Sequence, residues 1–266
     1  MHSVLLWLGL GAGLFGQASP EPIKLLGRTT APASVSAPLV SAATPSTPVK
    51  AAGKASAAEE VVAAVSALSR YVTEQSHPEA LRTAIRAYYN FKTANPDRVR
   101  NPYLYFVDYG LSNRAARGYV FDMRDLKLVE GPFTVAHGRG SGADGAPTRF
   151  SNRSGSAATS LGLYVTQETY SFSGKSGGRS YGSVGLRLAG VSGEFNSKAR
   201  ARGVVAHGAP YVTSTRAGRS EGCPAMEQAR ARRLLPKIAN GGMVFLFSPR
   251  DTNWMHSDPW INAASS

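Results

Sequence analysis

Two stretches that follow residue 56 carry apolar side chains at the spacing of an amphipathic helix. The first contains Val61, Val65, Leu68 and Val72, and the second contains Leu81, Ile85 and Tyr88. The segment 76–79, Ser-His-Pro-Glu, has the form of a capping box, which predicts the start of the second helix, and Asn-Pro at 95–96 predicts its end. We assign His77 to this cap and not to a catalytic site. A helical segment that packs on the following domain is therefore predicted over residues 57–95.

Beyond Pro102 the pattern changes to short apolar runs that are separated by glycine-rich turns. Runs of this length and composition predict β-strands. They lie at 104–107, 119–121, 133–135, 161–165, 184–188, 204–205 and 243–247. We therefore predict a mainly β fold with flanking helices, in which an antiparallel sheet or barrel-like sandwich forms one domain over 96–250. Residues 251–266 are predicted to be a C-terminal tail.

The first 56 residues lack these periodicities. The run VLLWLGLGAGLF is apolar for 12 positions, too short to span a bilayer, and Gly16-Gln17-Ala18 has the small-x-small pattern of a cleavage site. We predict a signal peptide over 1–18, and hence an exported protein of the periplasm or cell envelope. Because no Lys or Arg precedes the apolar run, it remains open whether the segment is cleaved or kept as an anchor. Residues 19–56, rich in Ala, Pro, Ser and Thr, are predicted to form a flexible tether.

The charge of the chain narrows the class of partner. A net charge of +13 at pH 7 predicts attraction to a polyanion. For an exported protein, an anionic cell-wall polymer or membrane surface is favoured over nucleic acid, for which no motif is present. One cysteine and five dispersed histidines show no metal-ligand spacing, so neither a metal nor another cofactor is expected.

The glycine-rich loop 137–142 reads His-Gly-Arg-Gly-Ser-Gly. It lacks the Gly-Lys-Ser/Thr ending of a phosphate-binding P-loop. We interpret it as a mobile rim of a functional site. His137 is interpreted as a structural histidine at the end of a strand, in preference to a second functional histidine.

The strongest chemical signal is the segment 219–225, Arg-Ser-Glu-Gly-Cys-Pro-Ala, which contains the only cysteine. A lone cysteine is most often a small buried hydrophobe, but Ser, Glu and Gly before Cys223 and Pro after it are typical of an exposed turn. Because Pro224 is a favoured first residue of a helix, Cys223 is predicted to lie at a helix N-cap, where a thiolate is stabilised and the thiol titrates below its usual pKa of about 8.5. His207, sixteen residues earlier, is predicted to act as its general base. Such a pair fits acyl transfer, hydrolysis and thiol redox chemistry alike.

Several segments together resemble the murein L,D-transpeptidase catalytic-domain family over roughly Tyr103 to Phe247. They are FVDYG, RGYVFDM, VAHGRGSG, FSNRSGS, SLGLYVTQETY, RGVVAHGAPYV and GRSEGCPAM. The resemblance implies a β-rich catalytic fold with Cys223 as nucleophile and His207 as its base, while Ser220 and Gly222 shape the loop. Gly208, in the His-Gly element, is placed with the substrate and oxyanion residues.

The chain departs from the better-known branch of that superfamily at two positions. There a Ser or Thr precedes the histidine and an Arg follows the cysteine by two residues, whereas here Ala206 and Ala225 occupy these places. The departure matches a divergent branch that ends in Cys-Pro-Ala. It leaves open which group orients His207 and which cation meets the substrate carboxylate. Arg219 is our first candidate for that cation and Arg216 the second.

The resemblance implies a reaction on peptidoglycan stem peptides. Cys223 attacks the carbonyl of the third stem residue of a tetrapeptide, D-Ala leaves, and backbone N–H groups at Gly222 and Cys223 hold the oxyanion. The thioester is then resolved by the amine of a neighbouring stem or by water. An L,D-transpeptidase is our first expectation, an L,D-carboxypeptidase is the alternative, and a non-catalytic wall-binding module of the same fold is a third.

Overall fold

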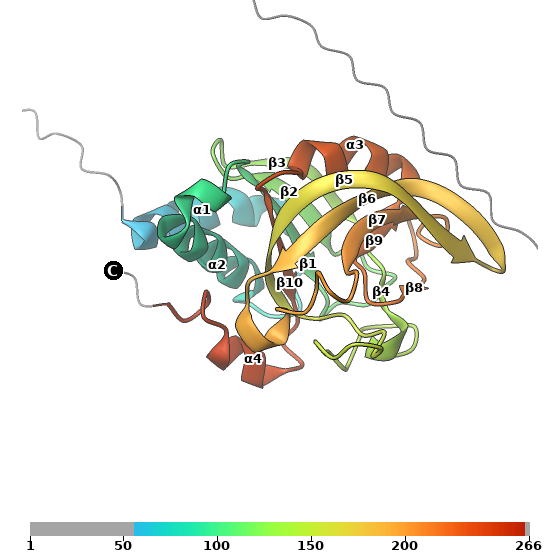
Figure 1. Cartoon of the computed structure of the whole chain (residues 1–266). Coiled ribbons are helices and arrows are strands. Elements are labelled where there is room, and N and C mark those ends of the chain that lie inside the picture. The colour runs from blue at the N-terminus through green and yellow to red at the C-terminus, as the bar shows by residue number, and fades with distance from the viewer. Residues whose placement is uncertain (1–55, 264–266) are drawn as a thin grey trace, which may run out of the picture. The chain divides into compact units, whose positions relative to one another are not determined.

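The computed structural model describes residues 56–263 (Figure 1). The predicted signal peptide and all but the last residue of the predicted tether lie outside this range. Within it, no helix is both long enough and apolar enough to cross a bilayer.

Two helices precede the sheet, as the periodicity predicts. Helix α1 spans Ala57–Leu68 and begins at a capping box made by Ser56 and Glu59. Helix α2 spans Ala80–Ala94 and ends at Asn95, as predicted. It starts later than predicted, at Ala80, and its N-cap residue Glu79 makes no side-chain capping bond.

The predicted capping box at 76–79 is wrong because its serine has another partner. The hydroxyl and backbone N–H of Ser76 both donate to the buried carboxylate of Asp108. The first turn of α2 is satisfied by neighbouring side chains instead. Gln75 Oε1 accepts from the N–H of Leu81 at 2.9 Å, and His77 Nδ1 accepts from that of Glu79 at 3.1 Å.

The mainly β class with N-terminal helices is confirmed. The strands are β1 Tyr103–Asp108, β2 Gly118–Asp122, β3 Lys127–Phe133, β4 His137–Gly138, β5 Gly162–Ser176, β6 Arg179–Gly190, β7 Val205–Ala209, β8 Arg219–Ser220, β9 Ala225–Glu227 and β10 Met243–Phe247. Eight of them form one sheet in the order β3-β2-β1-β10-β5-β6-β7-β9, and β4 pairs with β8. Helices α3, Gln228–Ile238, and α4, Thr252–Ser257, complete the fold.

The pairing is mixed and not antiparallel throughout, which corrects the sequence-based expectation. Strands β1 and β10 are parallel, and so are β7 and β9. Parallel neighbours need a crossover connection, because the chain must return to the same end of the sheet. Between β7 and β9 this crossover is the segment 210–224, which carries Cys223. The topology therefore places the cysteine loop at one edge of the sheet, next to β9.

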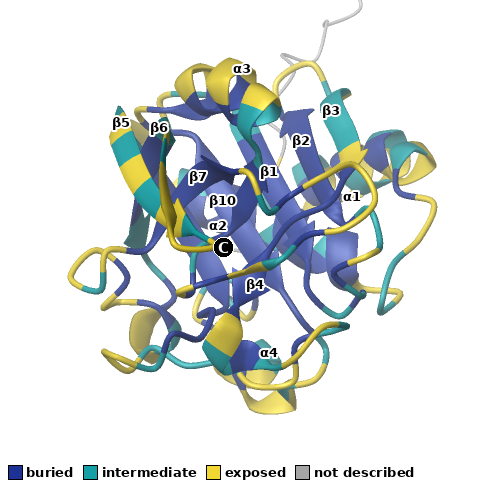
Figure 2. Cartoon of the chain, turned by 90° about the vertical axis from the view of Figure 1, so that its right-hand side faces the viewer, coloured by how far each residue is buried: buried dark blue, intermediate teal, exposed yellow. Residues whose placement is uncertain are grey.

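The core surrounds β10, whose five residues are all fully buried. Side chains of a strand alternate between the two faces of the sheet, so a strand buried along its whole length must be covered on both. Phe245 and Phe247 of β10 contact Trp254 of α4. Figure 2 shows these central strands buried, whereas the far halves of β5 and β6 project as a largely exposed hairpin.

The predicted C-terminal tail packs on the domain. Trp254 is fully buried, and its Nε1 donates to the Ser248 carbonyl at 2.8 Å. Trp260 contacts Phe91 of α2 edge-on, and its carbonyl accepts from Asn90 Nδ2 at 2.9 Å. The predicted strand at 133–135 is shifted, since β3 ends at Phe133. Beyond it, Ala136 forms an isolated bridge with Ala225, two residues after Cys223.

Candidate active site

The register of β7 and β9 places Cys223 next to the strand that carries His207. His207 pairs with Ala225 in parallel register, so the ladder extended by two residues brings Cys223 opposite Val205. Cys223 itself precedes the paired part of β9, and its thiol lies near the start of β7, with Sγ 3.9 Å from the Gly203 carbonyl oxygen and the N–H of Val205 hydrogen-bonded to the thiol. One strand spacing and two residues of rise put the Cα atoms of Cys223 and His207 roughly 8 Å apart. The structure thus brings the two predicted residues together at one site.

The helix that the sequence predicts at Pro224 does not begin there. Residues 225–227 form β9, and α3 starts only at Gln228, five residues after the cysteine. Proline at 224 favours a helix start, but pairing of 225–227 with β7 dominates over this local preference. The predicted N-cap position of Cys223 is wrong, and the positive end of α3 is too far away to stabilise its thiolate, because that effect fades within the first turn.

Close backbone contacts fix the shape of the cysteine loop. Gly222 has φ +119°, and a Cβ on it would lie 2.8 Å from the Ala158 carbonyl oxygen. A Cβ on Gly138 would lie 2.8 Å from the Cα of Gly222. Both positions therefore need glycine, one for its conformation and both for space. Residues 137–138 pair with β8, and Ala136 forms a bridge with Ala225. These contacts bring the glycine-rich loop 137–142 next to the cysteine segment 219–225.

Ser220 ties this loop together with two hydrogen bonds. Its Oγ accepts from the N–H of Gly222 at 3.2 Å and donates to the carbonyl of Cys223 at 2.7 Å. The Gly222 N–H is therefore engaged and does not serve as an oxyanion donor in this conformation, contrary to expectation. In the part of the chain that the structure describes, the N–H of Cys223 donates to no protein group, and it is the donor left for an oxyanion.

His207 is buried and held in one tautomer. Its Nδ1 lies 3.0 Å from the carbonyl oxygen of Gly208, and since a carbonyl only accepts, Nδ1 carries the proton. Nε2 is then the basic nitrogen. The ring also stacks on Phe172 of β5, with ring centroids 4.2 Å apart. Gly208 thus supplies the orienting group that the sequence left open, through its backbone and not through a neighbouring hydroxyl.

Burial lowers the pKa of His207, against the smaller opposing effect of its hydrogen bond to Gly208. Burial also raises the pKa of the half-buried Cys223 thiol to about 11. The backbone N–H of Val205 and the charge of Arg202 act to lower that pKa, and the carboxylate of Glu221 acts to raise it. Both shifts favour the neutral forms, so at neutral pH Cys223 is a thiol and His207 is a neutral imidazole.

Arg202 is a charged residue near the thiol that the sequence motifs do not single out. Its Nη2 donates to the Ala158 carbonyl at 2.7 Å and to Ser156 Oγ at 3.2 Å, and its Nη1 donates to the Ser151 carbonyl at 2.8 Å. These bonds hold its positive charge behind Gly222, within range of the thiol. The only available signal was its position at the head of the element RGVVAHG, because nothing else distinguishes it from the other arginines.

The predicted low thiol pKa is therefore replaced by the opposite expectation. Alkylation of Cys223 by iodoacetamide should keep accelerating above pH 8.5, because burial keeps the thiol protonated beyond the usual range. The measurement is the alkylation rate of the native chain from pH 6 to 11, with the urea-unfolded chain as the control for an ordinary thiol. A rate that levels off below pH 7.5 in the native chain would contradict this environment.

The two arginines proposed for substrate binding differ in their contacts. Arg216 pairs with the carboxylate of Asp144, and both side chains are exposed. Arg219 is exposed, forms no ion pair in the described residues, and has only a 3.4 Å contact with the Gly142 carbonyl. Arg219 is therefore the more available cation. An exposed pair between Arg139 and Glu221 also lies at this rim, where solvent screening leaves it little stabilising effect.

His137 has a structural position. It is fully buried, its Nδ1 lies 3.0 Å from Nη2 of the buried Arg117, and burial followed by the Arg117 charge lowers its pKa to about 4. Hydrogen bonds anchor the loop that follows, whereas the sequence analysis interprets it as a mobile rim. The Gly138 N–H donates to Thr159 Oγ1 at 3.0 Å, and Ser141 Oγ accepts from the Thr159 N–H at 2.9 Å. Across residues 56–263, no group of three His, Cys, Asp or Glu side chains is placed to hold a metal ion.

Comparison with known proteins adds a family assignment to this geometry. The sequence matches the L,D-transpeptidase catalytic domain family over residues 72–247, a range that contains α2, the whole eight-stranded sheet, Cys223 and His207. No curated protein matches the chain.

Solved structures with similarity to this chain are distant. One is an L,D-transpeptidase from Mycobacterium smegmatis, with 13% identity and a TM-score of 0.33, for which 55% of this chain and 58% of that chain are covered. A second is an L,D-transpeptidase from Stackebrandtia nassauensis, with 14% identity and a TM-score of 0.34, for which 71% of this chain and 78% of that chain are covered. A third is an L,D-transpeptidase from Xylanimonas cellulosilytica, with 15% identity and a TM-score of 0.33, for which 58% of this chain and 68% of that chain are covered. The match thus spans less than two thirds of the Mycobacterium smegmatis chain.

Proposed function

This chain belongs to the L,D-transpeptidase catalytic domain family, and from that premise we propose that it catalyses cysteine-dependent acyl transfer on peptidoglycan stem peptides. The observation that carries the proposal is that the Cys223 thiol lies by Gly203 and Val205, at the start of the strand that carries His207. The tautomer of His207 leaves Nε2 as the base, and Cys223 has a free N–H for an oxyanion. A nucleophile, a base that a third group orients and an oxyanion donor are the parts that acyl transfer requires.

The first half-reaction forms a thioester. Sγ of Cys223 attacks the carbonyl carbon of the third stem residue while His207 Nε2 takes the thiol proton, because the resting pair is neutral. The Cys223 N–H donates to the oxyanion. When this intermediate collapses, the carbon–nitrogen bond to D-Ala breaks, and the departing nitrogen receives the proton from His207. The acyl group then remains on sulfur.

The second half-reaction regenerates the thiol. The amine of a neighbouring stem gives a proton to His207 Nε2 as it attacks the thioester carbonyl, and the sulfur leaves and is reprotonated. An acceptor amine that is held in position attacks at a high effective concentration and so competes with water. The +13 charge favours attachment to an anionic wall polymer, where acceptor stems are concentrated.

The test is mass spectrometry of digested sacculi after incubation with the enzyme. Transfer yields stems that are joined through their third residues. Accumulation of tripeptides alone would identify an L,D-carboxypeptidase, and unchanged sacculi would fit a wall-binding module. The proposed place of action is the periplasm or cell envelope. It rests on residues 1–56, and recovery of the mature protein in the cytoplasmic fraction would contradict it.

We propose Arg219 as the cation that meets the substrate carboxylate. Arg219→Ala should raise KM for a soluble tetrapeptide about tenfold or more and leave kcat within about threefold, because a clamp already formed in the ground state contributes uniform binding. The control is Arg216→Ala, which removes a guanidinium that Asp144 already engages. Steady-state D-Ala release measures both, and a KM defect only in Arg216→Ala would move the clamp to that residue.

A further inference from the structure

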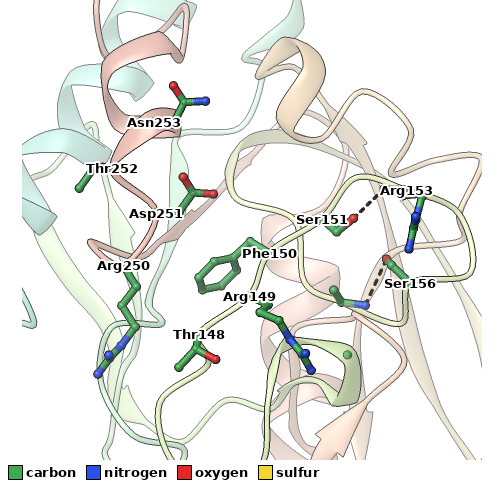
Figure 3. Close-up of a pocket in the computed structure, with 12 residues that line it drawn as sticks. Thr148, Arg149, Phe150, Ser151, Arg153, Ser156, Arg250, Asp251, Thr252 and Asn253 are labelled. Carbon is green, nitrogen blue, oxygen red and sulfur yellow. Dashed lines mark hydrogen bonds between the residues drawn. The ribbon is translucent and has the colours of Figure 1, made fainter.

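A cavity of about 740 Å³ lies beside the cysteine loop but does not contain the cysteine. Most of its wall comes from two segments far apart in the sequence, the loop 148–158 and residues 250–253 at the start of α4, and Gly140 completes it. In Figure 3 the ring of Phe150 faces Arg250 and Asp251, and Arg149 and Arg250 extend on opposite sides of Thr148. The mechanism above uses none of these side chains.

The cavity is basic, because its lining holds three arginines and one carboxylate. Arg149, Arg153 and Arg250 line it, and all three are exposed. Within residues 56–263 none of their guanidinium groups forms an ion pair or a hydrogen bond, although ten ion pairs neutralise arginines elsewhere. Asp251 is the single carboxylate in the lining. Three free cations around one hollow create a positive potential that attracts an anionic ligand.

One wall of the cavity is shared with the catalytic loop. Ser156 and Ala158 line the cavity, and both accept hydrogen bonds from Nη2 of Arg202. The carbonyl of Ala158 is also the group against which Gly222 packs. A ligand in the cavity is therefore one layer of backbone away from the residue that precedes Cys223.

The lining selects the chemistry of the ligand. Guanidinium groups bind carboxylates through paired hydrogen bonds, Asp251 offers a partner for an ammonium group, and the ring of Phe150 offers apolar contact. A phosphodiester polymer would bring only negative charge to Asp251. We propose that this cavity binds a second, carboxylate-rich peptide stem that bears a free amine, next to the stem that reacts at Cys223. This inference rests on the proposed function, because it takes peptidoglycan stems as the substrate.

The experiment measures binding without chemistry. In the full chain carrying Cys223→Ala, calorimetry with a tripeptide stem that has a free amine on its third residue should detect this site, and amide shifts should map it to 148–153 and 250–253. Adding Arg149→Gln, Arg153→Gln and Arg250→Gln should weaken that binding at least tenfold, since each lost contact is a charge-assisted hydrogen bond. The matched control, Arg100→Gln, Arg114→Gln and Arg232→Gln, removes three exposed unpaired arginines and should change affinity less than threefold.

Asp251→Asn tests the amine. It should weaken binding of the amine-bearing tripeptide about threefold or more and leave the affinity for an N-acetylated tripeptide unchanged.

Equal affinity in the two triple variants would overturn the proposal, and so would tighter, arginine-dependent binding of a glycerol-phosphate oligomer. Thioester formation from a tetrapeptide is then measured in chains that keep Cys223. It separates failure of the cavity proposal from failure of the proposed function. No thioester in the wild type refutes the function, whereas a normal thioester with undiminished tripeptide binding in the cavity variant refutes only the cavity.

Discussion

Cys223→Ala should reduce D-Ala release from a tetrapeptide stem to the rate without enzyme. Alanine cannot form the covalent intermediate, and no other described cysteine can replace it, because Cys223 is the only one in the chain. D-Ala release is measured with a coupled amino-acid oxidase assay.

The fold should survive this change. The side chain is half-buried, and its contacts are a 3.9 Å approach of Sγ to the Gly203 carbonyl and a hydrogen bond from the N–H of Val205. Ser220 holds the loop through backbone groups that alanine keeps. We expect a Tm within about 4 °C of wild type, as for a loss of at most about 1 kcal/mol. Stem affinity within threefold of wild type is the matching control. Retained turnover in a correctly folded variant would contradict the assignment of the nucleophile.

His207→Ala should lower kcat/KM by about 10²-fold or more at pH 7.5, the typical effect of losing a general base. The pH profile separates this role from a packing role. Burial lowers the pKa of His207, so the neutral base persists below its ordinary pKa of 6.5. In wild type kcat/KM should therefore stay level from pH 8 to about 6.5 and fall only at lower pH, and this acid limb should disappear in the variant.

Phe172→Leu is the control for the loss of packing. It removes the aromatic partner that stacks on His207 and keeps both the base and the Gly208 carbonyl that orients it. We expect kcat/KM within tenfold of wild type and an unchanged acid limb. An acid limb that survives in His207→Ala would show that another group titrates there.

The sequence singles out Cys223 and His207 as the candidate pair, because the chemistry of each is carried by residue type and by short motifs. It failed at Pro224, where a local helix preference was overridden by pairing of 225–227 with β7. A contact of this kind, between segments brought together by a crossover, leaves no local pattern. The predicted capping box failed for the same reason, since Ser76 finds its partner in Asp108, 32 positions away.

The missing parts of the site are of a kind that sequence patterns do not report. Gly208 orients His207 with its carbonyl, a group that every residue has. Ser220 was recognised as part of the motif, but only the structure explains that its hydroxyl engages the Gly222 N–H and leaves that of Cys223 free. Arg202 is one of 30 basic residues, and its effect on the thiol depends on three backbone and hydroxyl acceptors in the loop 151–158.

Intact-mass analysis of the wild-type chain after brief incubation with a soluble tetrapeptide stem tests the central claim most directly. A thioester on Cys223 predicts a mass increase equal to the stem less one alanine. Digestion should place the adduct on the peptide that contains Cys223, and hydroxylamine should remove it. A chain that stays unmodified while D-Ala is released, or an adduct on any other residue, would contradict the mechanism.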